Sequence, residues 1–412
     1  MKASDGASTA ERAAASRGWP VLGWRAALLL AGLLVCAGCV LPTSRRPPLP
    51  GRTTLGSPLV ILPARAIGNF LLLEVKWDRF GPYHFLVDTG SSMTLVTPAL
   101  ARRYPGRTVP PAAMTPVRGA NGRIIELPRG SLRRLELGEA KFEDIDVLLY
   151  DCAPLSAHLG VRIDGVLGFP LFREVLLTLD YPGSRVILQS VREAPLVPGS
   201  VVPFDDARKT PLISVRLGER TIAALIDSGS DALFSLNPVG LAPAFAFGPT
   251  VGATVGTISG DRTQMIGRLA GSMTIGGYEF SQPIVEVTDA LSAIGGGMLR
   301  HFSVTFDQQR DRVTFYRESR DPIPTPPRRS AGVSFNKTPA YWRVDGVVPG
   351  SSAAAAGLQA GDLVVRINGE SVAKWDLLRY EQLVAATGEI TLTLLNGNNE
   401  SERTVKVFEL VP

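Results

Sequence analysis

A long internal repeat is the feature of this sequence that most constrains its fold. The segments Phe85–Ser91 and Leu225–Ser230 each place an aspartate after apolar residues and before a Thr-Gly or Ser-Gly pair. Further landmarks recur around both aspartates in the same order: Leu73–Trp77 and Ile213–Leu217 upstream, then Leu135–Gly138 and Met273–Gly276, Phe142 and Phe280, Val166–Gly168 and Ala293–Gly295, and Asp180 and Asp307 downstream. A register kept over so many positions indicates a duplicated unit. We expect the two units to pack around a pseudo-two-fold axis, as the subunits of a dimer do.

The pattern within each unit predicts β-structure. Apolar and polar residues alternate over short segments separated by Gly, Pro and Asn turns, and no stretch has a long helical period. We therefore expect a mainly β protein in which each unit forms an antiparallel β-barrel or sandwich.

Breaks in composition predict the domain boundaries. The 412 residues exceed what one compact core usually holds, so two or three domains are expected. The predicted segments are a signal peptide over 1–39, a Pro-rich tether over 40–58, a first lobe over 59–193, a second lobe over 194–318, a Pro-rich linker over 319–330 and a C-terminal domain over 331–412.

The N-terminal segment predicts export. Arginines precede the apolar stretch Ala26–Val35, which is short for a membrane span but suits a signal-peptide core. Ala37 and Gly38 directly before Cys39 resemble a bacterial lipobox, although Cys36 stands where leucine is usual. The resemblance implies lipidation of Cys39 and a protein anchored in the bacterial cell envelope facing the periplasm, with the outer membrane favoured. A plain signal peptide or an uncleaved anchor is the alternative.

The two Asp-Thr/Ser-Gly triplets resemble the active-site motif of pepsin-like and retropepsin-like aspartic peptidases, over about residues 59–318. The resemblance implies a bilobal fold of two β-barrel halves with pseudo-two-fold symmetry. It also implies that Asp88 and Asp227 are the catalytic pair and that they activate a water without cofactor or metal. Two carboxyl groups at such a short distance share one proton, because they cannot both ionise.

The residues around each aspartate have roles that follow from their chemistry. The hydroxyls of Thr89 and Ser228 can bond across the axis to the opposite loop. We expect Gly90 and Gly229 to turn the backbone with positive φ and to bring N–H groups to the carboxylates. We expect the hydroxyls of Ser91 and Ser230 to donate to the outer carboxylate oxygens.

Family members close over substrate with a glycine-bearing hairpin flap. The candidate in the first half contains Gly119 and Gly122, and the candidate in the second half contains Gly260. Two flaps resemble a retropepsin more than pepsin, and neither stretch holds the flap tyrosine of pepsin. The alternative is that these are two surface hairpins.

Residues 331–412 resemble a bacterial PDZ domain, a small α+β fold. The segments Val344–Ala353 and Ala356–Gly369 carry the resemblance through a Pro-Gly turn, an Ala-rich helix and an A-G-L-x-x-G-D motif. It implies that the loop Gly332, Val333, Ser334 and Phe335 receives a peptide C-terminus, with a helix over Trp375–Ala385 flanking the groove. A spacer domain without ligand is the alternative.

Other chemistries fit the sequence poorly. It has only three histidines and no H-E-x-x-H, and its net charge of +5 is spread without a basic-aromatic patch, so zinc-peptidase chemistry and nucleic-acid binding are not expected. The predicted function is an aspartic endopeptidase whose PDZ domain docks substrate or partner C-termini. The alternative is a catalytically inactive, exported peptide-binding adaptor that keeps the fold.

Overall fold

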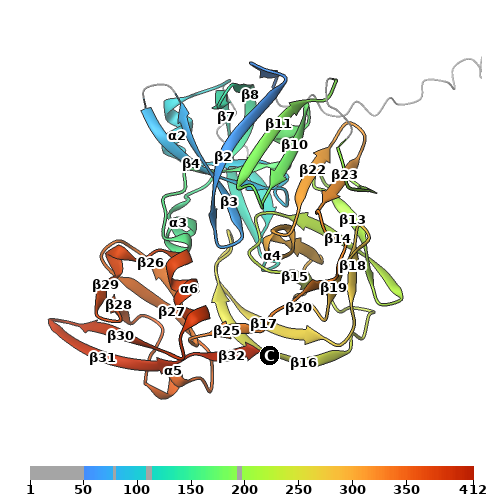
Figure 1. The fold of residues 1–412 in the computed structure, drawn as a ribbon. Helices are drawn as coiled ribbons and strands as arrows, with labels where there is room; N and C mark the ends of the chain where they lie inside the picture. Colours follow the sequence, from blue (N-terminus) through green and yellow to red (C-terminus); the bar gives the residue numbers. More distant parts are fainter. Residues whose placement is uncertain (1–50, 78–79, 108–113, 193–196) are drawn as a thin grey trace, which may run out of the picture. The chain divides into compact units, whose positions relative to one another are not determined.

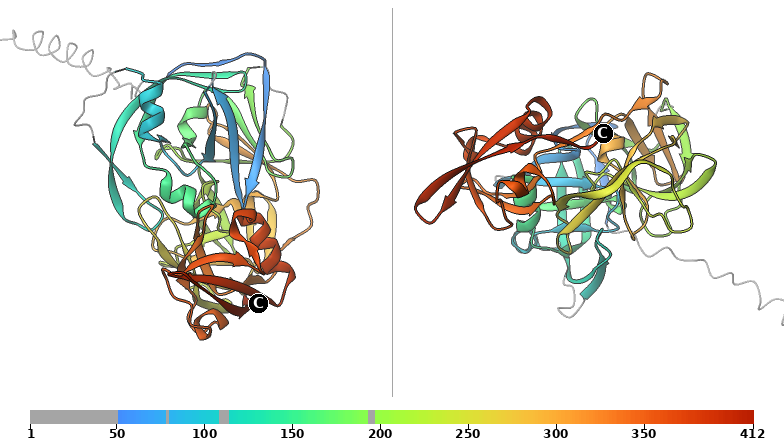
Figure 2. Two further views of the ribbon diagram at one scale, coloured as in Figure 1. Left: turned by 90° about the vertical axis from the view of Figure 1, so that its left-hand side faces the viewer. Right: turned by 90° about the horizontal axis from the view of Figure 1, so that it is seen from below.

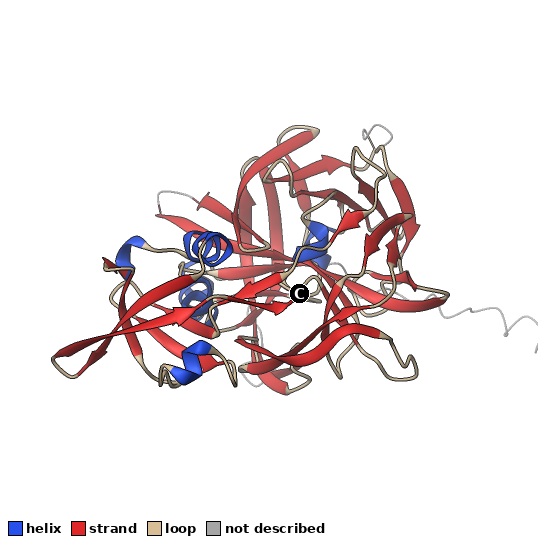
Figure 3. Cartoon of the chain, turned by 60° about the horizontal axis from the view of Figure 1, so that its bottom comes forward, coloured by secondary structure: helices blue, strands red, loops and turns tan. Residues whose placement is uncertain are grey.

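The computed structural model describes residues 51–77, 80–107, 114–192 and 197–412. Strands dominate and the helices are short (Figure 3), which confirms the predicted mainly β class. The chain from residue 50 onward forms one compact unit. None of the helices in these described ranges combines the length and the apolar character needed to cross a membrane.

The first lobe is built from eleven strands and short helices. They are β1 (Thr53–Leu55), β2 (Leu59–Ile67), β3 (Phe70–Trp77), β4 (Phe80–Asp88), β5 (Thr94–Val96), α2 (Pro98–Arg103), β6 (Met114–Arg118), β7 (Ile124–Leu137), β8 (Ala140–Leu149), α3 (Ala153–Leu159), β9 (Gly165–Gly168), the 3₁₀ turn η1 (Phe169–Phe172), β10 (Val175–Asp180) and β11 (Arg185–Ser190).

The second lobe repeats this plan with fewer elements. They are β12 (Ser200–Pro203), β13 (Leu212–Leu217), β14 (Arg220–Asp227), β15 (Phe234–Leu236), β16 (Phe245–Val255), β17 (Arg262–Leu269), β18 (Met273–Ile275), β19 (Tyr278–Ser281), β20 (Ile284–Val287), β21 (Ala293–Gly295), α4 (Gly296–Leu299), β22 (Ser303–Asp307) and β23 (Arg312–Tyr316).

Strand pairing shows the duplication directly. In the first lobe the sheet runs β3-β4-β9-β5-β8-β7, and in the second it runs β13-β14-β21-β15-β20-β17. The central strands pair with the same polarity in both, because β4 and β9 are parallel, as are β14 and β21. Residues alternate between core and solvent as a half-buried strand requires; in β13, Ile213 and Val215 are buried while Ser214 and Arg216 are exposed.

A shared sheet joins the two lobes. Its order is β12-β23-β22-β10-β11-β2, so strands from early and late parts of the chain lie side by side (Figures 1 and 2). At its centre β10 pairs with β22, and the Thr178 and Thr305 hydroxyls are 2.8 Å apart. Asp180 and Asp307 end equivalent strands, and each pairs with an arginine of the following strand, Arg185 and Arg312. This pairing places the pseudo-two-fold axis between β10 and β22.

The C-terminal region forms a separate small sheet with two helices and its own core around Trp342. Its elements, with the strands that precede it, are β24 (Ile323–Pro324), β25 (Arg328–Ser330), β26 (Val333–Lys337), β27 (Trp342–Val347), α5 (Ser352–Ala355), β28 (Leu363–Ile367), β29 (Glu370–Ser371), the 3₁₀ turn η2 (Val372–Lys374), α6 (Leu377–Ala386), β30 (Glu389–Asn396), β31 (Asn399–Lys406) and β32 (Phe408–Val411).

The two Pro-rich stretches carry more structure than the sequence predicts. Within the predicted tether, β1 pairs with β8 of the first lobe. Within the predicted linker, β24 pairs with β19 of the second lobe and β25 pairs with β32. Arg268 in β17 also donates to the Thr325 carbonyl at 2.9 Å. Backbone groups of the linker therefore form hydrogen bonds with the second lobe and with β32, which holds the linker in a defined position.

Candidate active site

The two aspartates of the repeated motif end equivalent strands. Asp88 is the last residue of β4 and Asp227 the last of β14, and they lie opposite Gly168 and Gly295 of the paired strands β9 and β21. A Cβ on Gly168 would be 2.5 Å from the Met93 backbone, so a side chain there has no room. The glycines thus let each aspartate loop pack closely against the strand behind it.

The hydroxyls after the aspartates lock the two loops together. Thr89 Oγ1 donates to the Ile226 carbonyl at 2.7 Å and accepts from Ser228 N at 3.0 Å. Ser228 Oγ repeats this with the Val87 carbonyl at 2.8 Å and Thr89 N at 3.0 Å. Thr89 and Ser228 are both fully buried. Because each hydroxyl satisfies a donor and an acceptor of the opposite loop, the spacing of the aspartates is fixed by the pair of loops.

The two carboxyl groups lie within hydrogen-bonding distance of each other. Backbone N–H groups surround them: Gly90 N and Ser91 N donate to Asp88 Oδ1 at 2.8 and 3.1 Å. Gly229 N donates to Asp227 Oδ1 at 3.0 Å. This arrangement favours a negative charge on one carboxylate while the other carries the proton that bridges the pair.

Burial raises the pKa of both carboxyl groups above the ordinary aspartate value. The pKa of Asp227 rises further, because the charge of Asp88 adds to the effect of burial. Backbone hydrogen bonds from Gly90, Ser91 and Gly229 act in the opposite sense and lower the pKa of Asp88. We therefore assign the charged state to Asp88 and the neutral, proton-donating state to Asp227.

Gly90 and Gly229 are needed for space. Their predicted positive φ is wrong, because neither lies in the left-handed region. A Cβ on Gly90 would lie 2.5 Å from Asp227 Oδ1, and one on Gly229 would lie 2.3 Å from Asp88 Cγ. Each glycine therefore permits the opposite carboxylate to approach its backbone.

The predicted role of the serine hydroxyls also needs correction. Ser91 Oγ donates to the Met93 carbonyl at 2.7 Å, so its one proton is not directed to the carboxylate. Ser230 Oγ accepts from Ala232 N at 3.4 Å. Ser91 contributes to Asp88 through its backbone N–H instead. The cause is the tight turn after each aspartate, whose own backbone groups are the nearest partners for a short side chain.

Comparison with protein families agrees with this geometry. The family model described as Aspartyl protease matches residues 74–171, which include Asp88 and its loop. The family model described as PDZ domain matches residues 343–396. The chain contains an aspartyl protease domain and a PDZ domain. Asp227 lies outside the matched range, and its equivalence to Asp88 rests on the duplicated strands and loops described above.

Among solved structures, the chain is similar to a PDZ domain protein from Parabacteroides distasonis ATCC 8503, at 22% sequence identity and a TM-score of 0.19. The similarity covers 20% of this chain and 21% of that one, so the chain spans about a fifth of that structure's length. No curated protein matches the chain.

The two predicted flaps of the protease domain are hairpins whose tips meet. Gly119 and Gly122 lie in the turn between β6 and β7, and Gly260 lies in the turn between β16 and β17. Asn121 Nδ2 donates to the Gly260 carbonyl at 3.2 Å, and the Ser259 hydroxyl donates to Asn121 Oδ1. The sequence did not single out Asn121 or Ser259. The two residues are far apart in the chain, so only the hydrogen bonds between the tips in the folded structure identify them as contacts between the flaps.

Partly buried apolar side chains from several elements pack on one group of core residues of the first lobe. They include Phe70, Met93, Val117, Ile125, Ile258 and Leu377. Met93 follows the first aspartate loop, while Val117 and Ile258 come from the two hairpins. Partly buried apolar side chains of this kind can contact apolar side chains of a peptide. The alternation of apolar and polar residues in the sequence predicts the hairpin strands, but it does not show toward which face the side chains of Val117 and Ile125 point.

The PDZ domain places its predicted peptide loop at the start of an edge strand. Gly332 has φ +77°, and Val333 and Phe335 are buried in the core of the domain. Ser334 Oγ accepts from Thr254 N of β16 at 3.3 Å. The strand β26 is the end strand of its sheet, and α6 packs beside it through the ring contact between Phe335 and Tyr380. The predicted flanking helix over Trp375–Ala385 is observed as α6.

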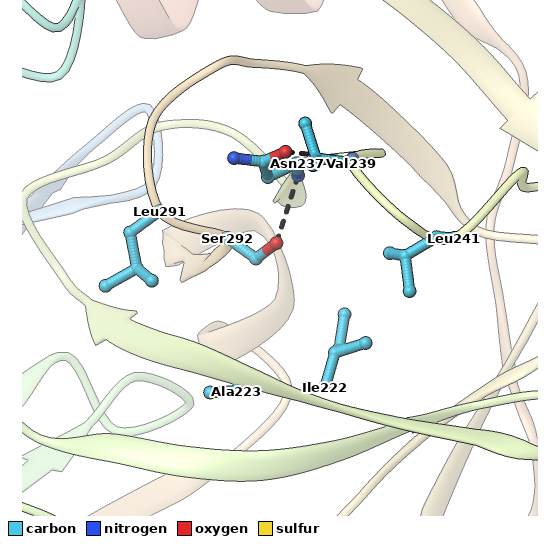
Figure 4. Close-up of a pocket in the computed structure, with 7 residues that line it drawn as sticks. All are labelled: Ile222, Ala223, Asn237, Val239, Leu241, Leu291 and Ser292. Carbon is cyan, nitrogen blue, oxygen red and sulfur yellow. Dashed lines mark hydrogen bonds between the residues drawn. The ribbon is translucent and has the colours of Figure 1, made fainter. Parts of the chain in front are cut away.

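A surface hollow of about 310 Å³ lies in the second lobe, apart from this chemistry (Figure 4). Its lining side chains are neutral: Ile222, Ala223, Asn237, Val239, Leu241, Leu291 and Ser292. Ser292 Oγ accepts from Asn237 N at 3.0 Å, so the polar groups there already serve the local backbone. The hollow offers no acid or base, and the aspartate pair remains the candidate active site.

The cysteines add no further chemistry to the described part of the chain. Cys152 is fully buried, and burial raises the pKa of its thiol to about 12, which keeps it protonated and unreactive. The predicted lipidation site, Cys39, lies outside the described residues.

Proposed function

We propose that this protein is an aspartic endopeptidase that hydrolyses polypeptides with a water activated by Asp88 and Asp227. The proposal rests on one observation above all: two half-buried carboxyl groups, held by paired loops, interact directly, and the pKa of Asp227 is raised more than that of Asp88. A pair with one charged and one neutral member supplies a general base and a general acid at the same place.

The hydrolysis proceeds in two steps. Asp88 accepts a proton from the water as its oxygen attacks the carbonyl carbon of the scissile peptide bond. Asp227 donates its proton to the carbonyl oxygen, which gives a neutral tetrahedral diol. The C–N bond then breaks, the proton held by Asp88 passes to the leaving nitrogen, and one hydroxyl returns its proton to Asp227. The amine and the carboxylic acid leave, and the pair regains its starting proton count.

Polypeptide is the substrate class that fits the surroundings of the pair. Partly buried apolar side chains after the first aspartate loop and in the hairpins, among them Met93 and Val117, can contact apolar side chains of a substrate. The hairpin strand β6 stands at the end of its sheet, so its outer backbone groups can pair with an extended chain.

Replacement of either aspartate tests the proposal. Asp88→Asn and Asp227→Asn should each lower kcat at least about 100-fold, because each removes the general base or the general acid. Both should melt cooperatively, since asparagine keeps the shape of the side chain. The control is Asp144→Asn, an exposed position within β8 where φ is +52° and asparagine is well tolerated. Cleavage of a peptide library at the wild-type rate by either active-site variant would exclude the mechanism and favour a peptide-binding adaptor.

We further infer that the PDZ domain docks the C-termini of substrates or partners. An extended chain end would add a strand beside β26, with its carboxylate bound by backbone N–H groups near Gly332. The end position of β26 in its sheet and the neighbouring α6 support this role. Because α3 and β16 also pack against β26, a docked chain end must displace part of that contact. Fluorescence titration with peptides that end in a free or an amidated carboxyl group measures it; equal affinity for both would exclude C-terminal recognition.

We also propose that Cys39 is lipidated and anchors the protein in the cell envelope, facing the periplasm, with the outer membrane favoured. The support is the sequence Val35-Cys36-Ala37-Gly38-Cys39 after an apolar stretch. Cys39→Ser should move the protein from the membrane fraction to the soluble one. An intact-mass measurement that finds an unmodified Cys39 would exclude the anchor.

A further inference from the structure

Three ligand-type side chains from distant parts of the chain meet outside the aspartate pair. His158 comes from α3, Asp261 from the tip of the second hairpin, and Asp345 from β27 of the PDZ domain. The elements that bring them together are in contact, because α3 packs against β26 and β16 packs against β26 and β27 (Figure 1). No other such group of three histidine, cysteine or acidic side chains occurs in the residues that the structure describes.

The ligand atoms are close enough to hold one cation. His158 Nε2 and Asp261 Oδ1 are 3.1 Å apart, and the three ligand atoms all lie within 4.8 Å of one another. Two ligands of a tetrahedral zinc ion at about 2.0 Å are separated by about 3.3 Å. The His158–Asp261 pair already has this spacing, and a rotation of the Asp345 side chain would complete it.

A buried carboxylate oxygen points to a missing partner at the same place. Asp345 Oδ1 accepts from Asn336 Nδ2 at 2.9 Å. Asp345 Oδ2 is shielded from solvent and has no hydrogen-bond partner. An unsatisfied buried oxygen is costly, since it has lost water without gaining another donor. A cation between His158 and Asp345 would satisfy it.

The base of the second hairpin is shaped around the imidazole. A Cβ on Gly256 would lie 1.4 Å from His158 Nε2, so any other residue there would displace the ring. The His158 side chain is only 18% exposed, whereas Asp261 at 47% leaves one side open to water. A bound ion would therefore have three protein ligands and one water.

We propose that His158, Asp261 and Asp345 bind a divalent transition-metal ion of the zinc class. One imidazole nitrogen with two carboxylate oxygens favours such an ion over Mg²⁺ or Ca²⁺, which prefer oxygen ligands alone. The ion joins α3 of the first lobe, the tip of the second hairpin and the PDZ domain. It thereby holds the hairpin against the PDZ domain and makes the position of this flap depend on the metal. This proposal stands independently of the hydrolytic function.

Metal binding to the purified full-length protein tests the site without an activity assay. After treatment with EDTA and removal of the chelator, titration with Zn²⁺ followed by calorimetry should show one site, and the bound metal should raise the melting temperature. His158→Gln should weaken binding about 100-fold or more, because it removes a direct ligand, whereas even neighbours of ligands contribute 10–100-fold. Asp345→Asn should have a similar effect.

The matched control is His84→Gln. His84 also lies between two carboxylates, but Glu74 is 3.7 Å from its Nε2 and Asp164 is 3.9 Å from its Nδ1. Those carboxylates face opposite ring nitrogens and cannot share one cation with the imidazole. Zinc affinity should be unchanged in this variant.

Gly256→Ala provides a second variant that removes no ligand. It should abolish high-affinity binding by displacing the His158 ring, while circular dichroism reports a folded protein. The proposal is overturned if the wild type binds no zinc above the level of His158→Gln, which would leave an ordinary ion pair between His158 and Asp261. It is equally overturned if zinc binds with unchanged affinity to both His158→Gln and Asp345→Asn.

Discussion

At Gly90 and Gly229 an added methyl group would meet the carboxylate of the opposite loop. Its nearest atoms would be Asp227 Oδ1 at 2.5 Å and Asp88 Cγ at 2.3 Å. These contacts are far shorter than van der Waals contact, so the carboxylate or the loop must move. A displaced carboxylate loses the hydrogen bond that lets the pair share a proton.

We predict that Gly90→Ala and Gly229→Ala each lower kcat at least about 100-fold, since small misplacements of reacting groups have effects of this size. The fold should persist, because the clash is local to the loops. Gly271→Ala is the matched control: nothing lies within 4 Å of the added Cβ and the backbone needs no positive φ. The measurements are peptide cleavage and a thermal melt, and wild-type cleavage by both loop variants would contradict the assignment.

The raised pKa values of the pair predict the pH dependence of cleavage. As the pH falls through the raised pKa of Asp88 the base is protonated, and as it rises through the higher pKa of Asp227 the acid loses its proton. The profile of kcat/KM should be a bell, with both limbs above the ordinary aspartate value of 3.8. A profile that stays flat from about pH 4 to about pH 9 would contradict the shared proton.

The same shifts set the sign of a stability change. A carboxyl group whose folded pKa is raised stabilises the fold below its unfolded pKa, and this contribution is lost as the pH rises through the folded value. Asp227→Asn cannot ionise, so its stability relative to the wild type should rise with pH. Urea unfolding of both proteins at several pH values measures the difference.

At the scale of elements, the two hairpins depend on each other. Asn121 bonds to the Gly260 carbonyl and receives the Ser259 hydroxyl, which ties the β6–β7 tip to the β16–β17 tip. Tyr150 adds a hydrogen bond from its hydroxyl to the Ile258 carbonyl at 3.3 Å. Each tip therefore restrains the other, and opening one requires breaking contacts of both.

We predict that Asn121→Ala loosens both tips together. The substitution removes two side-chain hydrogen bonds between the tips and a third, from Arg123 N to Asn121 Oδ1, within the first tip. The two bonds between the tips, at about 1 kcal/mol each, should speed amide exchange at the tips roughly 5- to 30-fold when they are lost. The reporting amides are Gly122 and Gly260, which close the two turns. Asn399→Ala, in the exposed β30–β31 hairpin of the PDZ domain, is the control and should leave both amides unchanged. Faster exchange at Gly122 alone would show that the tips move independently.

At the scale of the whole molecule, the PDZ domain and the strands after the linker support the second lobe. An apolar cluster joins Ile266 and Ile284 of the protease domain to Val348, Leu410 and Val411. Lys337 of β26 donates to the His158 carbonyl at 2.7 Å on the first lobe. These contacts, with the paired linker strands, make the PDZ domain part of the same compact unit.

We predict that a chain truncated after Ser330 has a less stable protease domain. Exposure of two isoleucines should lower the free energy of unfolding by about 3 kcal/mol or more, and the melting temperature by about 6 °C or more. Val411→Asp should cause part of the same loss in the full chain, because Val411 is fully buried in this cluster. Unchanged melting of the protease domain in both proteins would show that the PDZ domain is only a spacer.

The sequence by itself determined the features encoded by local pattern. The repeat around Asp88 and Asp227 specified two equivalent β-units, because strand periodicity and an Asp-Thr/Ser-Gly turn can be recognised from residues that are adjacent in the sequence. The A-G-L-x-x-G-D motif specified the PDZ domain in the same way. The predicted mainly β class and the PDZ domain were confirmed, because strand periodicity and the A-G-L-x-x-G-D motif are local patterns, even though the strands they specify pair over long distances in the chain.

Only the tertiary structure decided what depends on residues distant in the chain. From its local sequence Gly90 is predicted to be a turn glycine, but in the structure it is required because the carboxylate of Asp227 lies beside it. The Ser91 hydroxyl donates to the Met93 carbonyl and not to the carboxylate of Asp88. The contact of the hairpin tips and the meeting of His158 with Asp345 have no local signature. Packing brings such residues together through many weak contacts at once, and no short segment of sequence encodes that outcome.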